Sequence, residues 1–298
     1  MSRDLPNLII IGAHKAATTS LYTYLAGHSE IYGSGKKELD YFTPLRYKKQ
    51  PDPIEDYKKY FADRKNEKYA IDASPAYMYG GKLLRDKMIE VLPPHKVIVI
   101  LREPVDRFLS NYNWLRAKLF IKPDEDLKIF IQKCIEEMKY PLQDNNFYRR
   151  SIEEGMYNDF VPEWVDAYDK EIKIIYFEKL ITNPKAIMVD LAKWLQIDDT
   201  PFLNMEFVTE NKTVFVKNKL VHSAALFLNN SFEVFLRRNH QLKVKLRNLY
   251  YKVNQEEKNN KIIDGESKEL LYSTYKESNK RLSNYLKSRS IQLSDWLN

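Results

Sequence analysis

The sequence predicts an α/β fold, a three-layer sandwich in which helices pack against a central parallel sheet. Short apolar runs rich in β-branched residues recur at 8–11, 69–72, 96–101 and 172–177, and this composition is typical of strands buried on both faces. Stretches with the apolar spacing of helices separate these runs. This alternation of strands and helices is what a parallel sheet requires, because parallel strands need long crossover connections.

Length and composition set the limits of this prediction. The chain has 298 residues, of which 44% are hydrophobic, and this is enough for one large α/β domain. We expect a single domain over 1–298, with its core at 7–197 and a helical C-terminal part at 204–298. The net charge of +7 favours anionic ligands, which include nucleotides, acidic glycans, nucleic acids and membrane surfaces.

Cysteine usage and apolar patterning predict the compartment. The single cysteine, Cys134, excludes an internal disulfide, and this suits a reducing compartment. Residues 1–6 lack the apolar core of a signal peptide, and no apolar run reaches the ~18 residues of a membrane span. We therefore expect a cytoplasmic protein.

The first predicted strand leads into a loop suited to an anion. Gly12 ends the strand, and the helix that follows has Leu21 and Leu25 on one face. The first N–H groups of a helix have no intrahelical partner, and the helix dipole favours a negative charge there. The loop adds one cation and a run of hydroxyls, so the predicted phosphate- or sulfate-binding residues are Lys15, Ala16, Ala17, Thr18, Thr19 and Ser20.

The order of residues in this loop separates two classes of enzyme. In the ATP-type loop G-x-x-x-x-G-K-[ST], lysine follows a second glycine, whereas Lys15 precedes the small residues Ala16 and Ala17. A nucleotide-dependent kinase is therefore disfavoured. The segment Lys15-Ala16-Ala17-Thr18-Thr19 resembles the K-x-G-T-T segment of sulfotransferases that use 3′-phosphoadenosine 5′-phosphosulfate (PAPS). In that family the segment holds the 5′-phosphosulfate.

Alanine at positions 16 and 17 departs from the family pattern. If position 17 needs a positive φ, Ala17 is strained there, because a Cβ disfavours the left-handed conformation. If position 17 is already helical, alanine is harmless. The resemblance implies a P-loop-like nucleotide-binding topology, and the compactness of the chain is bacterial-like.

A long polar and aromatic loop follows at 33–56, and loops of this length are usually functional or mobile. It contains Lys36-Lys37-Glu38-Leu39-Asp40-Tyr41-Phe42, which resembles the K-E-x-x-x-F segment of the glycan-sulfating, heparan-type branch. The resemblance implies that Glu38 is the catalytic general base, which a sugar hydroxyl needs when it attacks. Pairing of Glu38 with a neighbouring lysine is the structural alternative. Asp40 assists Glu38 or binds a cation, and His14 is the other titratable candidate beside the donor.

A second loop carries the arginine expected to bind the nucleotide. After the predicted strand at 96–101 comes a segment with Arg102 at the strand end and Ser110 two helical turns along. This segment resembles the family's R-x-P-x-x-R-x-x-S-x-Y segment, which binds the 3′-phosphate, and the planar fork of arginine suits phosphate oxygens. Tyr157 matches a G-x-Y of the family and is expected near the adenine. The segment Asp72-Ala73-Ser74-Pro75 lacks the lysine that the glycan branch often has there.

The later part of the chain is predicted to be mainly helical. Apolar spacing indicates helices at 122–140, 183–194 and 266–286. Lys212, Lys217 and Lys219 lie where relatives have a basic loop over the nucleotide. The basic stretch 237–252 is compatible with a helix for peripheral contact with a membrane surface or an anionic polymer, and equally with a solvated helix face.

Together these motifs predict an enzyme that transfers a sulfuryl group from PAPS to an acceptor hydroxyl and releases adenosine 3′,5′-bisphosphate. Lys15 and Glu38 are the predicted catalytic residues, and Lys15 would stabilise charge on the leaving oxygen. A glycan is favoured as acceptor over a lipid or a small alcohol, and we expect no metal and no nucleic-acid partner. The alternative from another class is a non-enzymatic binder of anionic polymers or membrane surfaces.

Overall fold

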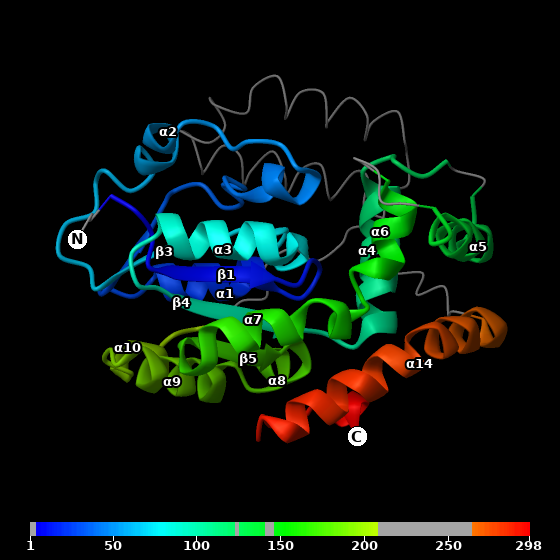
Figure 1. Ribbon diagram of the computed structural model, residues 1–298. Helices are drawn as coiled ribbons and strands as arrows, with labels where there is room; N and C mark the ends of the chain where they lie inside the picture. The colour runs from blue at the N-terminus through cyan, green and yellow to red at the C-terminus, as the bar shows by residue number, and fades with distance from the viewer. Residues whose placement is uncertain (1–3, 123–124, 141–145, 208–263) are drawn as a thin grey trace, which may run out of the picture.

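The computed structural model describes residues 4–122, 125–140, 146–207 and 264–298. Its centre is a five-stranded parallel sheet flanked by helices (Figure 1), which confirms the predicted fold class. The strand order is β2-β3-β1-β4-β5. The strands are β1 (Leu8–Gly12), β2 (Ile31–Gly33), β3 (Tyr69–Ala73), β4 (Lys96–Leu101) and β5 (Ile172–Tyr176).

The central strand β1 fixes where a ligand can bind. β1 is buried along its whole length and pairs with β3 on one side and β4 on the other. The chain passes from β3 to β4 across β1, so the strand order reverses beside β1. In open parallel sheets, ligands bind at such a reversal, outside the carboxyl ends of the strands. The loops after β1, β3 and β4 therefore define the functional edge of the sheet.

Two helices begin at the proline and capping residues that the sequence marks as helix starts. Pro104 is the first residue of α4, and Asn183 caps α9 by accepting a hydrogen bond from the N–H of Ala186, as its capping preference predicts. The helices in the described part of the chain are α1 (Thr18–Ala26), α2 (Ile54–Lys58), α3 (Gly81–Val91), α4 (Pro104–Ala117), α5 (Leu127–Glu137), α6 (Phe147–Glu153), α7 (Val161–Tyr168), α8 (Phe177–Thr182), α9 (Pro184–Leu195), α10 (Thr200–Leu203) and α14 (Gly265–Ser288).

Two predicted segments differ from the structure. The helix predicted at 122–140 begins only at Leu127, because the side chain of Asp126 accepts a hydrogen bond from the N–H of Ile129 and caps the helix there. The loop predicted at 33–56 contains a 3₁₀ turn, η1 (Thr43–Tyr47), and the start of α2. Apolar periodicity could not reveal these elements, because each has only five residues and makes little more than one turn.

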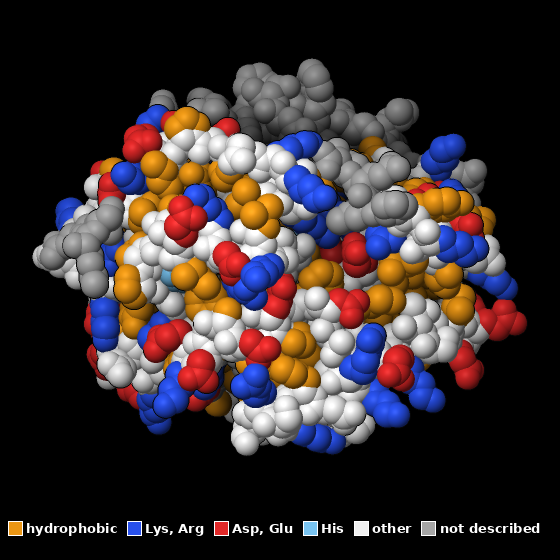
Figure 2. Space-filling view, in the orientation of Figure 1, with side chains coloured by type: hydrophobic (Ala, Val, Ile, Leu, Met, Phe, Trp, Pro, Cys, Tyr) orange, Lys and Arg blue, Asp and Glu red, His pale blue; other side chains and the backbone are white. Residues whose placement is uncertain are grey.

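Two hydrophobic clusters hold the molecule together. The larger one surrounds the sheet and extends from Leu5 to Leu297, whereas the second joins α4, α5, α6 and α14 through buried residues such as Phe130 and Tyr275. Figure 2 shows hydrophobic side chains gathered over α5 and α6. The helix predicted at 266–286 is present as α14, and it packs back on the domain through contacts with α4, α5 and α7.

The single-domain prediction over 1–298 stays a prediction. Lys212, Lys217, Lys219 and the basic stretch 237–252 lie outside the described residues. Within the described ranges, none of the helices is both long enough and apolar enough to span a membrane.

Candidate active site

The loop between β1 and α1 is shaped for close contact with an anion. A Cβ on Gly12 would lie 2.7 Å from the Cβ of Met78, so only glycine fits at the strand end. Lys15 and Ala17 have φ angles of 66° and 63°. The expectation of strain at Ala17 is therefore met, at a cost of about 1–2 kcal/mol for a left-handed residue with a Cβ. Ala17 precedes α1 without a side-chain cap, so the helix start can be capped by a ligand anion.

Lys15 lies in a partly buried and strongly positive environment. Burial lowers the pKa of Lys15 to about 8, against the attraction of Glu38, and the charges of Arg102, Lys118 and Lys37 lower the pKa further. These interactions place the two predicted catalytic residues in one electrostatic neighbourhood. A negative ligand relieves the repulsion between the cations, so the site favours binding of a polyanion.

Arg102 joins the two predicted anion-binding loops. It follows β4, and its Nη1 donates a hydrogen bond of 3.0 Å to the carbonyl oxygen of Lys15. The guanidinium stacks 4.2 Å from the ring centroid of Phe177, and its buried Nε has no hydrogen-bond partner. An unpaired buried donor on arginine is costly, and a phosphate oxygen would pair with it. Ser110, two turns into α4, is half-buried.

Tyr157 binds the backbone of Arg102 through its hydroxyl group. Its side chain is fully buried, and its hydroxyl donates to the carbonyl of Arg102 at 2.9 Å and accepts from the N–H of Arg102 at 3.4 Å. Tyr157 therefore fixes the backbone of the predicted phosphate-binding arginine. A contact between Tyr157 and the adenine stays a prediction.

The acidic loop holds Glu38 beside Lys15 in a constrained backbone. Glu38 and Asp40 have φ angles of 61° and 55°, and the N–H of Glu38 donates to the carbonyl of Ala73 at 3.1 Å. The side chain of Glu38 is 54% exposed and pairs with Lys37. Glu38 is therefore open to an acceptor that arrives from solvent.

Asp40 is more enclosed than Glu38. Burial raises the pKa of its carboxyl, and the hydrogen bond that Thr43 donates at 3.1 Å acts in the opposite direction. The charge of Glu38 also raises the pKa of Asp40, whereas that of His14 lowers it. Thr43, Glu38 and His14 therefore each lie within reach of Asp40, by hydrogen bond or by charge.

A buried carboxylate that sequence analysis did not identify anchors this loop. Asp72 at the end of β3 is fully buried and accepts hydrogen bonds from the hydroxyls of Tyr57, Tyr77 and Ser74 at 2.8–2.9 Å. Burial raises the pKa of Asp72 to about 6, against the effect of these hydrogen bonds. Ser74 in turn accepts from the N–H of Asp40 at 3.0 Å. Asp72 therefore fixes the loop that carries the predicted base.

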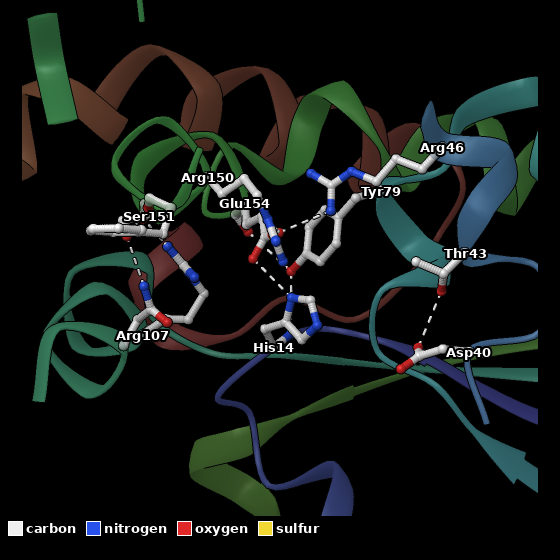
Figure 3. A network of polar contacts seen from close by, with 11 residues as sticks. His14, Asp40, Thr43, Arg46, Tyr79, Arg107, Arg150, Ser151 and Glu154 are labelled. Carbon is white, nitrogen blue, oxygen red and sulfur yellow. Dashed lines mark hydrogen bonds and ion pairs between the residues drawn. The ribbon is translucent and has the colours of Figure 1, made fainter. Parts of the chain in front are cut away.

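His14 is held by a second buried carboxylate that sequence analysis did not identify. Its Nδ1 lies 2.8 Å from Oε2 of Glu154, and its ring stacks on Tyr79 with centroids 5.3 Å apart. Because ionised Glu154 can only accept, Nδ1 carries the proton. The second ring nitrogen is directed away from Glu154, toward the side of the site that holds Asp40 (Figure 3).

Glu154 is the meeting point of three side chains that donate N–H groups. Besides His14, it accepts hydrogen bonds from Arg46 at 3.0 Å and Arg150 at 2.9 Å (Figure 3). Burial alone would raise the pKa of Glu154, but His14, Arg150 and Arg46 hold it well below its usual range. Arg46 belongs to η1, so Glu154 ties the loop after β1 to the loop that carries Glu38 and Asp40.

The geometry on this sheet edge defines a class of protein: an α/β protein with two predicted anion-binding loops after neighbouring strands and titratable side chains beside them. No group of three potential metal-ligating side chains occurs within the described ranges. The sulfotransferase domain family model matches residues 81–263, which is more than half of the chain. The chain therefore belongs to the sulfotransferase family, so the resemblance to this family seen in the sequence is confirmed.

Individual relatives agree with this assignment. The chain is 27% identical over 208 residues to the human bifunctional heparan sulfate N-deacetylase/N-sulfotransferase 2, covering 67% of this chain and 23% of that protein. A membrane-associated sulfotransferase of Dictyostelium discoideum is 35% identical over 119 residues, covering 38% and 24%. The chain thus spans about a quarter of the length of these curated relatives.

A solved structure shows the same fold. The crystal structure of a sulfotransferase from Alicyclobacillus acidocaldarius superposes with a TM-score of 0.69 at 19% identity, covering 100% of both chains. At this identity the likeness establishes the fold. The roles of the individual site residues therefore depend on the geometry described above.

The lowered pKa of Lys15 predicts a pH-dependent affinity for anions. Lys15 carries its charge below a pKa of about 8, so affinity for adenosine 3′,5′-bisphosphate should be high at pH 7 and fall as the pH rises above 8. The expected loss is about tenfold between pH 7 and pH 9, because a single proton is coupled to binding. Isothermal titration calorimetry across this range measures it. Lys15→Arg keeps its charge and should abolish the decline, and an unchanged decline in this variant would assign the titration to another group.

The network around Glu154 predicts a large effect on stability. Glu154→Gln leaves Arg46, whose side chain is 3% exposed, without its ion-pair partner, so the free energy of unfolding should fall by about 3 kcal/mol. Urea unfolding at pH 7 measures this change. The matched control is Glu153→Gln, which removes a single ion pair with Arg149 and should cost about 1 kcal/mol or less. Equal losses in the two variants would contradict the special position of Glu154.

Proposed function

We propose that this protein transfers the sulfuryl group of PAPS to a hydroxyl group of a glycan. The observation that carries the proposal is the hydrogen bond from Arg102 to the carbonyl of Lys15, because it joins the two predicted anion-binding loops into one site. PAPS has anionic groups at both the 5′ and the 3′ positions, and a site with two linked cationic loops suits such a donor.

The residues on this edge fit the donor. Lys15 and the start of α1 would hold the 5′-phosphosulfate, since a helix N-terminus and an ammonium both favour negative charge. Arg102 has a buried Nε without a partner, and Ser110 lies two turns further along the same segment. These two side chains would hold the 3′-phosphate.

The proposed reaction is an in-line displacement at sulfur. The acceptor oxygen forms a bond to sulfur while the bond from sulfur to the bridging oxygen of the 5′-phosphate breaks, and adenosine 3′,5′-bisphosphate leaves. Lys15 neutralises the charge that develops on the bridging oxygen, and Glu38 takes the proton of the acceptor hydroxyl. As in phosphoryl transfer, positioning and charge stabilisation supply most of the rate enhancement.

A glycan is the acceptor that the observations favour. The human relative is by name an enzyme of heparan sulfate, and the Glu38 segment resembles the glycan-sulfating branch. Glu38 is half exposed, and an exposed base can reach the hydroxyl of a large acceptor. Lipid headgroups and small alcohols are the acceptors against which the glycan has to be tested.

The donor assignment predicts a preference for the 3′-phosphate. Adenosine 3′,5′-bisphosphate should bind at least tenfold more tightly than adenosine 5′-phosphate, and Arg102→Ala should abolish this difference, because charged hydrogen bonds to phosphate contribute about 1.5–3 kcal/mol. Calorimetry with both nucleotides measures the preference. Arg289→Ala, which removes an exposed arginine paired with Asp166, is the control and should retain it. Equal affinity of the wild type for both nucleotides would exclude the 3′-phosphate site.

The base assignment predicts a selective loss of chemistry. Glu38→Gln should bind nucleotide normally and lose about 10²–10⁴-fold in the rate of transfer, because glutamine cannot accept the proton. Single-turnover rates at saturating PAPS measure this loss, with Asp40→Asn and His14→Asn as comparison variants. Asp40→Asn should lose less. If Glu38→Gln stays within about threefold of wild type while His14→Asn is inactive and still binds nucleotide, the base is His14.

A further inference from the structure

Beside Lys15, an exposed group of aromatic rings lies at the end of α4. The ammonium of Lys15 lies 5.1 Å from the ring centroid of Trp114. The ring of Phe120 is centred 6.0 Å from that of Trp114 and 6.4 Å from that of Phe147. Trp114 is 38% exposed and Phe120 is 56% exposed. We name Trp114, Phe120 and Phe147 the aromatic shelf.

The shelf is held in place by buried rings behind it. Phe147 packs at a tilt against Tyr148 with ring centroids 4.3 Å apart, and the ring centroid of Tyr148 lies 5.4 Å from that of Phe130. Phe130 is fully buried in the second hydrophobic cluster. Because the exposed rings continue a packed core, a ligand that binds to them would lose little affinity to side-chain ordering.

The residue before Phe120, Leu119, has a strained backbone at the end of α4. The N–H of Phe120 donates to the carbonyl of Leu115, and the N–H of Leu119 donates to that of Arg116, each at 3.0 Å. This is the Schellman ending of a helix, in which the left-handed residue is usually glycine. Here it is Leu119, with a φ of 60° and 40% exposure. The turn thus leaves two large apolar side chains, Leu119 and Phe120, exposed next to Trp114.

A positive charge borders the shelf on the side of Lys15. Lys118 is the C-cap residue of α4, two residues before Phe120, and it acts electrostatically on Lys15. Aromatic faces carry partial negative charge and attract C–H groups that carry partial positive charge. One face of a sugar ring presents such C–H groups, whereas its hydroxyl groups point outward from the ring edge.

We propose that the aromatic shelf binds a sugar ring of an acidic glycan and directs one of its hydroxyl groups toward Lys15. The proposal rests on the sulfuryl transfer proposed above and names the surface that selects the acceptor. Trp114 and Phe120 stack on the sugar, and the exposed Lys118 attracts its acidic groups. Trp114 lies beside Lys15. A sugar ring stacked on Trp114 therefore has one of its hydroxyl oxygens next to the sulfur that is transferred.

Phe120→Ala tests the shelf most cleanly, because no ring contact joins Phe120 directly to Lys15 within the described ranges. With an unsulfated oligosaccharide of alternating uronic acid and glucosamine as acceptor, Phe120→Ala and Trp114→Ala should raise KM for the acceptor about tenfold or more. KM for PAPS should stay within twofold in Phe120→Ala, and Trp114→Phe should retain most of the acceptor affinity. Tyr272→Ala, which removes an aromatic ring of 47% exposure on α14, is the matched control and should behave as wild type.

Direct binding separates failure of this inference from failure of the proposed function. Calorimetry should show that the oligosaccharide binds the wild type in the presence of adenosine 3′,5′-bisphosphate, and binds Phe120→Ala about tenfold more weakly. Wild type that binds the nucleotide but not the oligosaccharide, or that prefers a neutral oligosaccharide or a long-chain alcohol, overturns the assignment of the shelf. Wild type that fails to bind the nucleotide overturns the sulfuryl-transfer proposal itself.

Discussion

The buried carboxylate of Glu154 is the interaction on which the rest of the site depends. One of its oxygens holds His14 of the loop after β1, and the other accepts from Arg46 of η1 and from Arg150. Three residues further along the chain, Tyr157 holds the backbone of Arg102. The short segment 154–157 therefore positions three loops: the loop after β1, the loop that carries Glu38, and the loop that carries Arg102. Such a network is stable only when every member is present, because a buried charge without its partner is very costly.

This dependence accounts for the strained backbone of the site. Four residues with side chains, Lys15, Ala17, Glu38 and Asp40, have positive φ angles, and strained residues persist only where the surrounding structure determines them. The Glu154 network supplies that restraint on the loop after β1, and Asp72 supplies it on the acidic loop through Ser74. The favourable energy of these buried contacts offsets the local strain, and the site is organised before any ligand arrives.

The sequence could predict features that depend on neighbouring residues, but not features that depend on contacts between distant parts of the chain. Strands, helix caps and the loops with Lys15 and Arg102 follow from local patterns, because apolar runs, prolines and capping residues act on their immediate neighbours. Glu154 and Asp72 could not be identified in this way, since Glu154 meets a histidine 140 positions earlier and Asp72 is surrounded by hydroxyls from separate elements. The one local signal was the place of Asp72 in a buried strand, where a carboxylate needs partners. Glu154 follows α6 and has no such signal. Likewise, no local pattern shows that Trp114 lies against Lys15.

Burial and neighbouring cations make the charged form of Lys15 costly in the free site. Burial is the largest cause of the lowered pKa of Lys15, and the charges of Arg102, Lys118 and Lys37 add to it, against the attraction of the half-exposed Glu38. A ligand that brings negative charge near both Lys15 and Arg102 would offset this repulsion. In the proposed reaction, negative charge would stay with the departing nucleotide beside Lys15. Cations that are fixed before the reaction begins would stabilise that developing charge.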